Sequence, residues 1–158
     1  MSERERRLLR RAADYQFGAG AGAALFPSFA ALSTTHTSSG RPRQVRAEAG
    51  RLVTYGVDGR YTLGVVGGHR LLDAFEAPRL RVAVGEESDP YVREGRNAFA
   101  KFVREADPAV RPGDEVLVTR EGTLLGVGRA ELPGAAMTDF ETGMAVKVRE
   151  GVDVEGSA

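Results

Sequence analysis

The sequence contains no cysteine, and this absence excludes several kinds of chemistry. Disulfides, thiolate zinc sites, iron–sulfur clusters and cysteine nucleophiles all require that side chain. The only histidines are His36 and His69, and neither has a carboxylate at ligand spacing. We therefore expect no metal and no other cofactor.

Long apolar segments are also missing. No stretch approaches the roughly 20 consecutive apolar residues that a membrane-spanning helix needs. Near the N-terminus, arginines interrupt the leucines and alanines of residues 4–13, which is unlike a secretory leader. We therefore expect a cytoplasmic protein that has no membrane partner.

Some residue types are absent or scarce. There is no isoleucine, Asn97 is the only asparagine, and Lys101 and Lys147 are the only lysines, against 20 arginines. These three residues could have survived by chance. Alternatively, their chemistry was required, because a compact ammonium group is not equivalent to a guanidinium group.

The formal net charge is zero, but the charge is unevenly distributed. Residues 1–77 carry 11 basic and 7 acidic side chains, whereas residues 78–158 carry 11 basic and 15 acidic ones. Net charge therefore gives no general reason to expect a nucleic-acid partner. Any such role must depend on local basic patches.

The first half of the chain has the pattern of a small α/β module. Apolar residues recur at helical spacing between Leu8 and Phe17, and short strand-like segments follow a polar stretch. In chain order we expect a helix from Ser2 or Glu3 to Phe17, a short helix ending before Pro27, a polar loop over Ser33–Gln44, strands over Val45–Ala47, Arg51–Tyr55 and Tyr61–Val65, and a helix over His69–Phe75 opened by Gly67 and Gly68.

Two features of this half are candidate phosphate-binding sites. The glycines of GAGAG (18–22) follow no strand and lack the lysine and hydroxyl residue of a P-loop, so we expect close helix packing or a turn. Arg41, Arg43 and Arg46 follow the polar loop. The pattern leaves open whether they form a solvated strand edge or contact phosphate.

The second half is a series of short strands with two small helices, which predicts a compact, partly closed β-barrel. The expected elements are a strand over Leu80–Val84, a helix from Ser88 or Asp89 to Gly95, strands over Glu115–Thr119 and Thr123–Ala130, a helical piece over Ala135–Phe140, a strand over Gly143–Arg149, and a frayed tail over residues 152–158.

The segment REGRNAFAKFVREADP (93–108) fits two local structures. Its composition favours a helix, with Phe99, Phe102 and Val103 at helical spacing. A period of two instead places Phe99, Lys101 and Val103 on one face of a strand.

Four segments of the second half resemble a PUA domain, the RNA-binding fold shared by pseudouridine synthases and archaeosine transglycosylases. They are EGRNAFAKFV (94–103), ADPAVRPGDEVLV (106–118), LLGVGRAEL (124–132) and GMAVKVREG (143–151). In the first half, RRAADYQFGAGAGAALF (10–26) and DGRYTLGVVGGHRL (58–71) resemble the module that precedes the PUA domain in archaeal tRNA-guanine transglycosylases and archaeosine synthase.

The resemblance implies an α+β fold with two domains. A small α/β module would cover residues 1–77, and a PUA-type, partly closed β-barrel with short helices would cover residues 78–154. Within the barrel, the resemblance favours a strand over Asn97–Val103 rather than a helix.

The catalytic part of that family has no counterpart in this sequence. The family's enzymes use an aspartate nucleophile on a TIM-type barrel with a cysteine-rich zinc site, and this sequence has neither the cysteines nor the length. The resemblance therefore implies a protein that is not an enzyme and that binds RNA. The expected RNA is tRNA, bound at its acceptor stem and 3′ end in connection with tRNA modification such as archaeosine formation.

In PUA domains RNA lies between the first helix, the next strand and the last strand, here Pro90–Glu94, Asn97–Val103 and Met144–Arg149. Cations there would contact phosphates, glycine would let the RNA backbone approach, and the asparagine would bond a base edge or a 2′-hydroxyl. The expected RNA-binding residues are Arg93, Gly95, Arg96, Asn97, Phe99, Lys101, Lys147 and Arg149.

Alternatives remain open for some of these residues and for the function. Phe99 or Phe102 could stack on an unpaired base or belong to the core, and Arg93 or Arg149 could form surface ion pairs. An accessory subunit of a tRNA-guanine transglycosylase or archaeosine synthase would instead dock through apolar residues. The candidates for that surface are Leu25, Phe26, Phe29 and Leu32.

A third possibility is an enzyme in its own right. The acidic pairs Glu86/Glu87 and Asp114/Glu115 are the nearest to a catalytic arrangement, but solvated strand ends and turns explain them.

Overall fold

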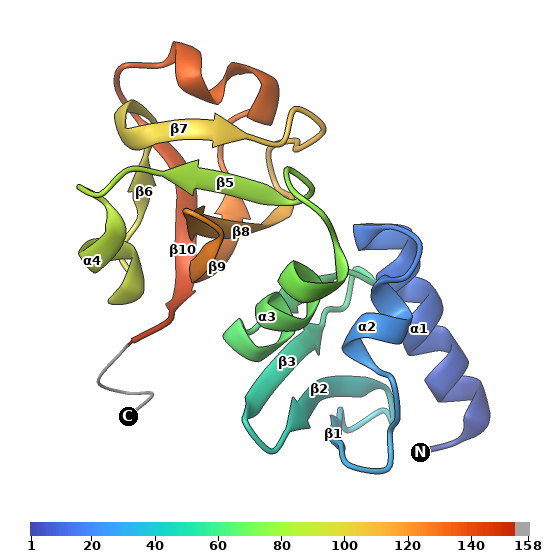
Figure 1. Ribbon diagram of the computed structural model, residues 1–158. Helices are drawn as coiled ribbons and strands as arrows, with labels where there is room; N and C mark the ends of the chain where they lie inside the picture. Colours follow the sequence, from blue (N-terminus) through green and yellow to red (C-terminus); the bar gives the residue numbers. More distant parts are fainter. Residues whose placement is uncertain (154–158) are drawn as a thin grey trace. The chain divides into compact units, whose positions relative to one another are not determined.

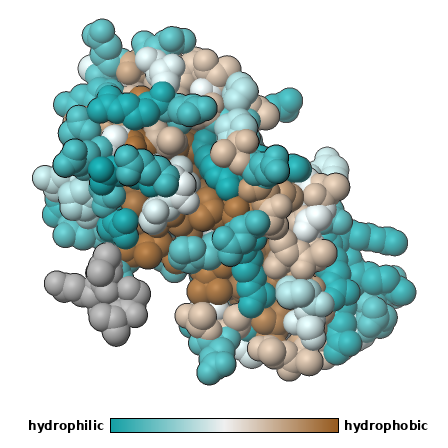
Figure 2. Space-filling model, viewed as in Figure 1, coloured by the Kyte–Doolittle hydropathy of each residue, from teal (hydrophilic) through white to brown (hydrophobic). Residues whose placement is uncertain are grey.

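The computed structural model describes residues 1–153, and the chain divides into two compact units, Met1–Ala74 and Phe75–Ala158 (Figure 1). In the view of Figure 2 both units present a mixture of hydrophilic and hydrophobic side chains. No helix within residues 1–153 is long and apolar enough to cross a membrane. The tail expected to fray lies outside the described residues from residue 154 on; its first residue, Val152, is hydrogen-bonded to Leu125 O (2.8 Å).

The first helix, α1 (Glu3–Phe17), begins at one of the two residues that the sequence predicts, and Ser2 caps it. The side-chain oxygen of Ser2 accepts a hydrogen bond from Glu5 N (3.2 Å), which satisfies one of the free N–H groups at the helix start. One face of the helix is buried, and it carries Leu9, Ala13 and Phe17. This spacing of four residues is the amphipathic pattern that predicted the helix.

The second helix, α2 (Ala21–Leu25), packs directly against α1. A Cβ atom at Gly22 would collide with the backbone of Arg10, so only glycine allows the two helices to approach this closely. The Asp14 carboxylate accepts a hydrogen bond from Gly22 N (2.7 Å). The GAGAG segment therefore serves helix packing, as expected.

A four-stranded antiparallel sheet, in the order β1–β2–β3–β4, completes the first unit. The strands are β1 (Ser33–His36), β2 (Pro42–Ala47), β3 (Gly50–Tyr55) and β4 (Tyr61–Leu63). The prediction of a loop over Ser33–Gln44 was wrong, because its first part forms β1. An edge strand pairs with one neighbour only, so a polar segment can form it without an alternating apolar pattern.

The third helix, α3 (Val65–Ala74), begins four residues before the predicted start at His69. Gly67 and Gly68 lie inside the helix rather than opening it. A Cβ atom at Gly67 would collide with the backbone of Leu52 on β3, so this glycine allows the helix to lie close to the sheet. The prediction failed because a glycine needed for packing has the same local signature as one that starts a helix.

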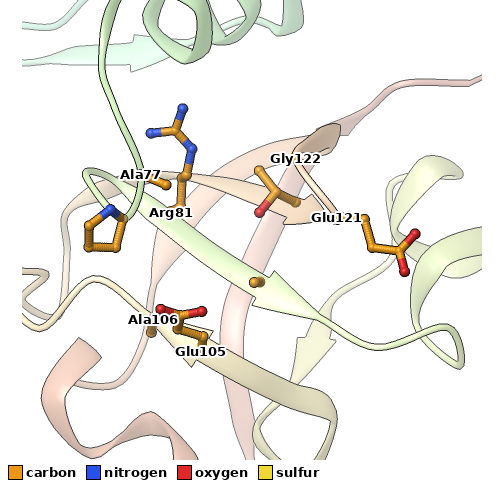
Figure 3. A pocket seen from close by; sticks show the side chains of 9 residues that line it. Ala77, Arg81, Glu105, Ala106, Glu121 and Gly122 are labelled. Carbon is orange, nitrogen blue, oxygen red and sulfur yellow. The ribbon is translucent and has the colours of Figure 1, made fainter.

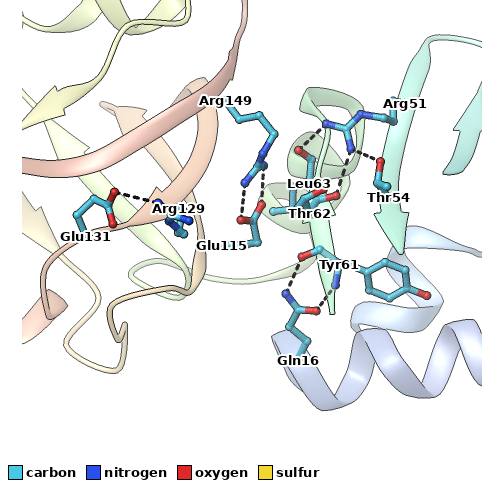
Figure 4. Close-up of polar contacts among 10 residues, drawn as sticks. All are labelled: Gln16, Arg51, Thr54, Tyr61, Thr62, Leu63, Glu115, Arg129, Glu131 and Arg149. Atoms are coloured by element: carbon cyan, nitrogen blue, oxygen red, sulfur yellow. Dashed lines mark hydrogen bonds and ion pairs between the residues drawn. The ribbon is translucent and has the colours of Figure 1, made fainter. Parts of the chain in front are cut away.

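Tyr61 joins the sheet to α1 (Figure 4). Its hydroxyl donates to Leu9 O (2.8 Å), and its backbone N–H donates to Gln16 Oε1 (2.6 Å) while Gln16 Nε2 donates to Tyr61 O (2.9 Å). Burial, with a smaller contribution from Tyr55, raises the pKa of the Tyr61 phenol. The side-chain amide of Gln16 thus satisfies the backbone N–H and C=O of Tyr61, as a neighbouring strand would.

The apolar residues expected to form a docking surface are largely part of this core. Leu25 and Phe26 are completely buried, while Phe29 and Leu32 are half-buried. The ring of Phe26 lies 5.3 Å from that of Phe29 and 6.1 Å from that of Tyr61, measured between centroids. The prediction of an open apolar surface there was wrong for Leu25 and Phe26, because both side chains are buried in the core of the unit.

The second unit is built on a six-stranded sheet in the order β6–β10–β9–β8–β5–β7. Its elements are β5 (Arg81–Val84), α4 (Asp89–Arg93), β6 (Ala98–Phe99), the 3₁₀ helix η1 (Ala100–Phe102), β7 (Val103–Ala106), β8 (Glu115–Arg120), β9 (Thr123–Ala130), the 3₁₀ helix η2 (Gly134–Asp139) and β10 (Met144–Gly151). The two end strands, β6 and β7, are joined through η1. The sheet is therefore a nearly closed barrel, as predicted (Figure 1).

The disputed segment is neither one helix nor one strand. β6 pairs with β10, the chain then turns through η1, and β7 pairs with β5. The predicted single strand over Asn97–Val103 was wrong: Val103 is buried while Phe99 and Lys101 are exposed, so the three do not share a face. A short 3₁₀ turn lets the chain change neighbours at the barrel's closure, and no local period signals that requirement.

Candidate nucleic-acid interface

A hollow of about 590 Å³ lies where α4, β6 and η1 meet. Three aromatic rings line it, one from each element, together with polar side chains. The lining residues are Glu87, Ser88, Tyr91, Arg96, Asn97, Phe99 and Phe102. Three of the predicted RNA-binding residues are among them, namely Arg96, Asn97 and Phe99.

Two of these aromatic rings are exposed to an unusual degree for large apolar groups. Tyr91 is 52% exposed and Phe99 46%, whereas Phe102 is partly buried. Cations border the same rings: Arg96 Cζ lies 5.7 Å from the Tyr91 centroid, and Lys101 Nζ lies 4.9 Å from the Phe102 centroid. Phe99 is thus available for stacking, and the barrel core does not require it.

Tyr91 was missed as a candidate from the sequence. It follows Pro90 in the first turn of α4, where a helix this short has little apolar surface to bury. An aromatic residue near the GRN turn was the only signal that could have identified it. The structure places its ring beside Arg96.

Asn97 fastens the start of β6 to the last strand. Its Oδ1 accepts a hydrogen bond from Val148 N (3.0 Å), so the amide oxygen has a structural role. Among the described residues, no hydrogen bond uses Asn97 Nδ2. The amide therefore offers a donor, and not an acceptor, to a ligand in the hollow.

Arg93 is engaged by a carboxylate rather than open to solvent. Its Nε lies 2.6 Å from Asp89 Oδ1, and Arg120 Nη1 lies 3.2 Å from Asp89 Oδ2. Burial alone would raise the pKa of the Asp89 carboxyl, but hydrogen bonds from Arg93 and Arg120 and their positive charges outweigh it and lower the pKa. This group of three side chains links α4 to β8.

Arg149 is similarly engaged. Its guanidinium forms two hydrogen bonds to the buried Glu115 carboxylate, at 2.7 and 2.6 Å, in the bidentate geometry that arginine favours (Figure 4). Lys147 lies two residues before Arg149 on β10, on the same exposed face of the strand. It is opposite Arg129 of β9. Arg129 pairs with Glu131 (3.2 Å).

The two lysines are the free cations of the predicted set. Both are exposed, and neither forms an ion pair with any residue between 1 and 153. Arg96 is also largely exposed, with Glu94 no nearer than 3.8 Å. Gly95 ends α4 with a φ of +91°, and a Cβ atom there would meet nothing closer than 4.0 Å. Glycine suits that backbone, and the turn is open.

A smaller hollow, of about 220 Å³, lies elsewhere on the barrel (Figure 3). Arg81, Glu105 and Glu121 supply its charged side chains. The Arg81 guanidinium donates to Phe75 O (2.8 Å) and Arg79 O (3.0 Å), and burial lowers its pKa. A guanidinium held by carbonyls and two carboxylates make this hollow a poor match for RNA.

Two family models match the chain. The patch-forming domain C2 of tRNA-guanine transglycosylase matches residues 7–78, and the PUA domain matches residues 80–152. Similar curated proteins include the tRNA-guanine(15) transglycosylases of Thermococcus kodakarensis (46% identical over 143 residues, 89% of this chain and 24% of the relative) and Methanothermobacter thermautotrophicus (39% over 145 residues, 90% and 22%). The chain thus spans about a quarter of the length of these relatives.

Solved structures share the fold at low sequence identity. A hypothetical protein of Pyrococcus horikoshii superposes with a TM-score of 0.70 at 21% identity, covering 100% of this chain and 98% of that one. A PUA domain of Aeropyrum pernix gives 0.68 at 21% identity, covering 96% and 84%. A conserved PUA domain protein of Thermoplasma acidophilum gives 0.65 at 18%, covering 96% and 91%.

The nearly closed six-stranded barrel with its short helices is a PUA domain, as the sequence predicted. The chain thus joins a region that matches the C2 domain of tRNA-guanine transglycosylase to a PUA domain. Over most of its length it is similar to the C-terminal region of the archaeal enzymes.

Proposed function

We propose that this protein is a noncatalytic, cytoplasmic tRNA-binding protein that holds the acceptor stem and 3′ end of its ligand. The observation that carries the proposal is the aromatic hollow of Tyr91, Phe99 and Phe102, bordered by the cations Arg96 and Lys101. The names of the relatives support tRNA as the RNA and its modification, such as archaeosine formation, as the context.

The hollow has the chemistry that an unpaired nucleotide requires. Stacking of a base on an exposed ring contributes about 1–3 kcal/mol, whatever the base. Asn97 Nδ2 can donate to a base or sugar acceptor, while Arg96, Lys101 and Lys147 can contact phosphates. An unpaired 3′ end supplies both the free base and the flexible backbone, whereas a paired stem alone supplies only the phosphates.

A noncatalytic role is supported by the state of the carboxylates. Asp89 and Glu115, the buried or half-buried acids of the barrel that face cations, are each held by arginine. Because each is paired with arginine, neither Asp89 nor Glu115 offers a free carboxyl group for catalysis. We do not assign the relatives' transglycosylase activity to this chain.

The proposal predicts that Lys101→Glu combined with Lys147→Glu weakens tRNA binding. Each lost phosphate contact reduces the slope of log Kd against log salt concentration by about 1, so the double variant should reduce it by about 2. Titrations of labelled tRNA at several salt concentrations measure this. The matched control is Arg79→Glu with Arg111→Glu, which changes the net charge of the same unit equally.

The same titration with a tRNA that lacks its unpaired 3′ nucleotides tests the hollow. We expect trimming to weaken binding by the wild type but not by a Phe99→Ala variant, because that variant already lacks the ring on which the base would stack. If the lysine variant binds intact tRNA as well as wild type does at low salt, the assigned surface is wrong.

The second candidate is an accessory subunit that docks on a tRNA-modifying enzyme, such as a tRNA-guanine transglycosylase or archaeosine synthase. The observation that favours it is that the curated relatives it matches are tRNA-guanine(15) transglycosylases, which makes such an enzyme the natural partner. Leu25 and Phe26 are buried and cannot serve as the contact. A pull-down from the native host that recovers no protein, together with strong tRNA binding by the purified chain, would argue against this candidate.

A further inference from the structure

The outer face of α1 carries a line of exposed arginines that the barrel site does not use. Arg4, Arg7 and Arg11 are all exposed, and they recur at intervals of three and four residues, which places them on one side of the helix. Tyr15, one turn further on, is 95% exposed. We refer to these four residues as the α1 outer face.

No carboxylate neutralises these arginines. The acidic residues of α1 are engaged elsewhere: Glu3 with Arg6 (3.7 Å), Glu5 with His36 (3.4 Å), and Asp14 with Gly22 N (2.7 Å). Within residues 1–153, none of the three arginines of the outer face has an ion pair or hydrogen-bond partner. The positive charge along this face is therefore uncompensated.

The other two arginines of the helix, Arg6 and Arg10, have partners within the unit. Arg10 donates two hydrogen bonds to Phe26 O (3.0 and 2.9 Å), and its guanidinium lies 5.1 Å from the Phe29 ring centroid. Arg6 lies 5.9 Å from the same centroid. Both therefore contribute to the core side of the helix, whereas the outer face is left for an external anion.

We propose that the α1 outer face is a second RNA-binding surface, separate from the barrel. Arg4, Arg7 and Arg11 contact successive phosphodiesters of one strand, and the Tyr15 ring stacks on a base next to them. The proposal depends on the proposed function in one respect, because it takes the ligand to be the same RNA.

The geometry of the face suits a phosphate backbone. At a rise of about 1.5 Å per residue, Arg4 and Arg11 are about 10 Å apart along the helix, so the cations form a line rather than a point. Guanidinium groups bind phosphate oxygens in a bidentate manner. A fully exposed aromatic ring beside a row of cations is the combination that single-stranded nucleic acid recognises.

A membrane surface and a protein partner fit less well. A helix that lies in a membrane must insert its apolar face, but that face of α1 is buried in the unit through Leu9, Ala13 and Phe17. The centres of protein interfaces are depleted in charged residues, whereas on this side of α1 three arginines surround a single exposed leucine, Leu8. RNA is the ligand that needs neither apolar insertion nor an apolar centre.

The test uses the full-length chain with Arg7→Glu and Arg11→Glu, titrated with the same tRNA. Arg79→Glu with Arg111→Glu is again the control, because it changes the net charge of the chain equally at residues assigned to neither RNA-binding surface. We expect the α1 variant to reduce the salt slope by about 2 and the control to change it much less. Tyr15→Ala should weaken binding roughly five- to a hundredfold.

The outcomes separate this proposal from the function proposed for the barrel. If the α1 variant binds as the control does while the Lys101/Lys147 variant loses affinity, the α1 surface is refuted and the barrel site stands. Equal losses in the α1 variant and its control also refute it, because they indicate only a general charge effect. If wild type binds no tRNA, the proposed function fails, and the α1 proposal fails with it.

One further arm addresses the membrane alternative. Sedimentation with phosphatidylserine vesicles that depends on Arg7 and Arg11, without a loss of tRNA binding in the variant, would overturn the assignment to RNA. Melting curves by circular dichroism verify that each variant is folded, and the exposed Tyr15→Ala variant keeps the test valid if the charge-reversed one unfolds.

Discussion

At the scale of single residues, the one asparagine and the two lysines of the chain have different roles. Asn97 is part of the fold through its bond to Val148 N, and it also lines the aromatic hollow. Lys101 and Lys147 have no ion pair among the described residues and are free for a ligand. Scarcity therefore identified three residues of interest, but it did not distinguish a structural role from a binding one.

The double role of Asn97 can be separated by two substitutions. Asn97→Ala removes the acceptor of the buried Val148 N–H and should lower the free energy of unfolding by about 1–3 kcal/mol. Asn97→Asp keeps an acceptor oxygen, so it should retain most of the stability while it removes the Nδ2 donor and weakens tRNA binding. Urea denaturation and tRNA titration measure the two effects. An alanine variant as stable as wild type would contradict the structural role.

At the scale of elements, α4 is too short to be stable by itself, and its attachment to the barrel matters more than its own propensity. The attachment consists of Val92, which is buried in the core, and the ion group of Asp89, Arg93 and Arg120. Since Tyr91 lies on the same helix, the position of the hollow depends on this ion group.

This attachment predicts a pH dependence. The pKa of Asp89 in the folded protein lies below the usual aspartate value of 3.8, so its ionised form stabilises the fold. The contribution is present in full above that value and is lost as pH falls through the folded pKa. Thermal melts should show Asp89→Asn below wild type at neutral pH, with the difference shrinking as pH falls below 3.8 and vanishing below the folded pKa.

The matched control is Asp139→Asn, which changes an exposed aspartate that has no ion pair among residues 1–153. It should melt close to wild type at every pH. If the Asp89 and Asp139 variants behave alike, the ion group does not hold α4 in place.

At the scale of the whole molecule, the opposite net charges of the two halves do not describe where RNA can bind. The acidic second half contains the aromatic hollow and two free lysines. Its buried acids are paired with arginines such as Arg93 and Arg149, so these acids do not pair with the lysines. In the first half, Arg10, Arg51 and Arg70 are used on backbone carbonyls. Arg4, Arg7 and Arg11, which are not used in this way, form the α1 outer face.

Two separate surfaces on one chain should contribute independently. A variant that combines Lys101→Glu, Lys147→Glu, Arg7→Glu and Arg11→Glu should lose the sum of the binding free energies lost by the two double variants, within about 0.5 kcal/mol. Titrations at about 50 mM salt, where electrostatic contacts are strong, measure the three losses. A combined loss well below the sum would show that the surfaces compete for the same part of the RNA.

The sequence by itself determined the class of fold, because the relevant signals are local. The apolar spacing and Ser2 cap of α1, the hairpin that joins β8 to β9, and the motifs around Gly95 and Asn97 depend only on near neighbours in the chain. The same local motifs carried the family resemblance and most of the candidate site.

Only the tertiary structure decided the rest, because the information lies in a distant partner. Gly67 belongs inside a helix since β3 passes beneath it, and Ser33–His36 is a strand since β2 lies beside it. The turn at η1 exists because the barrel must close between β10 and β5. Which arginines are free depends likewise on which carboxylates and carbonyls the fold brings near them, and no spacing in the sequence encodes that.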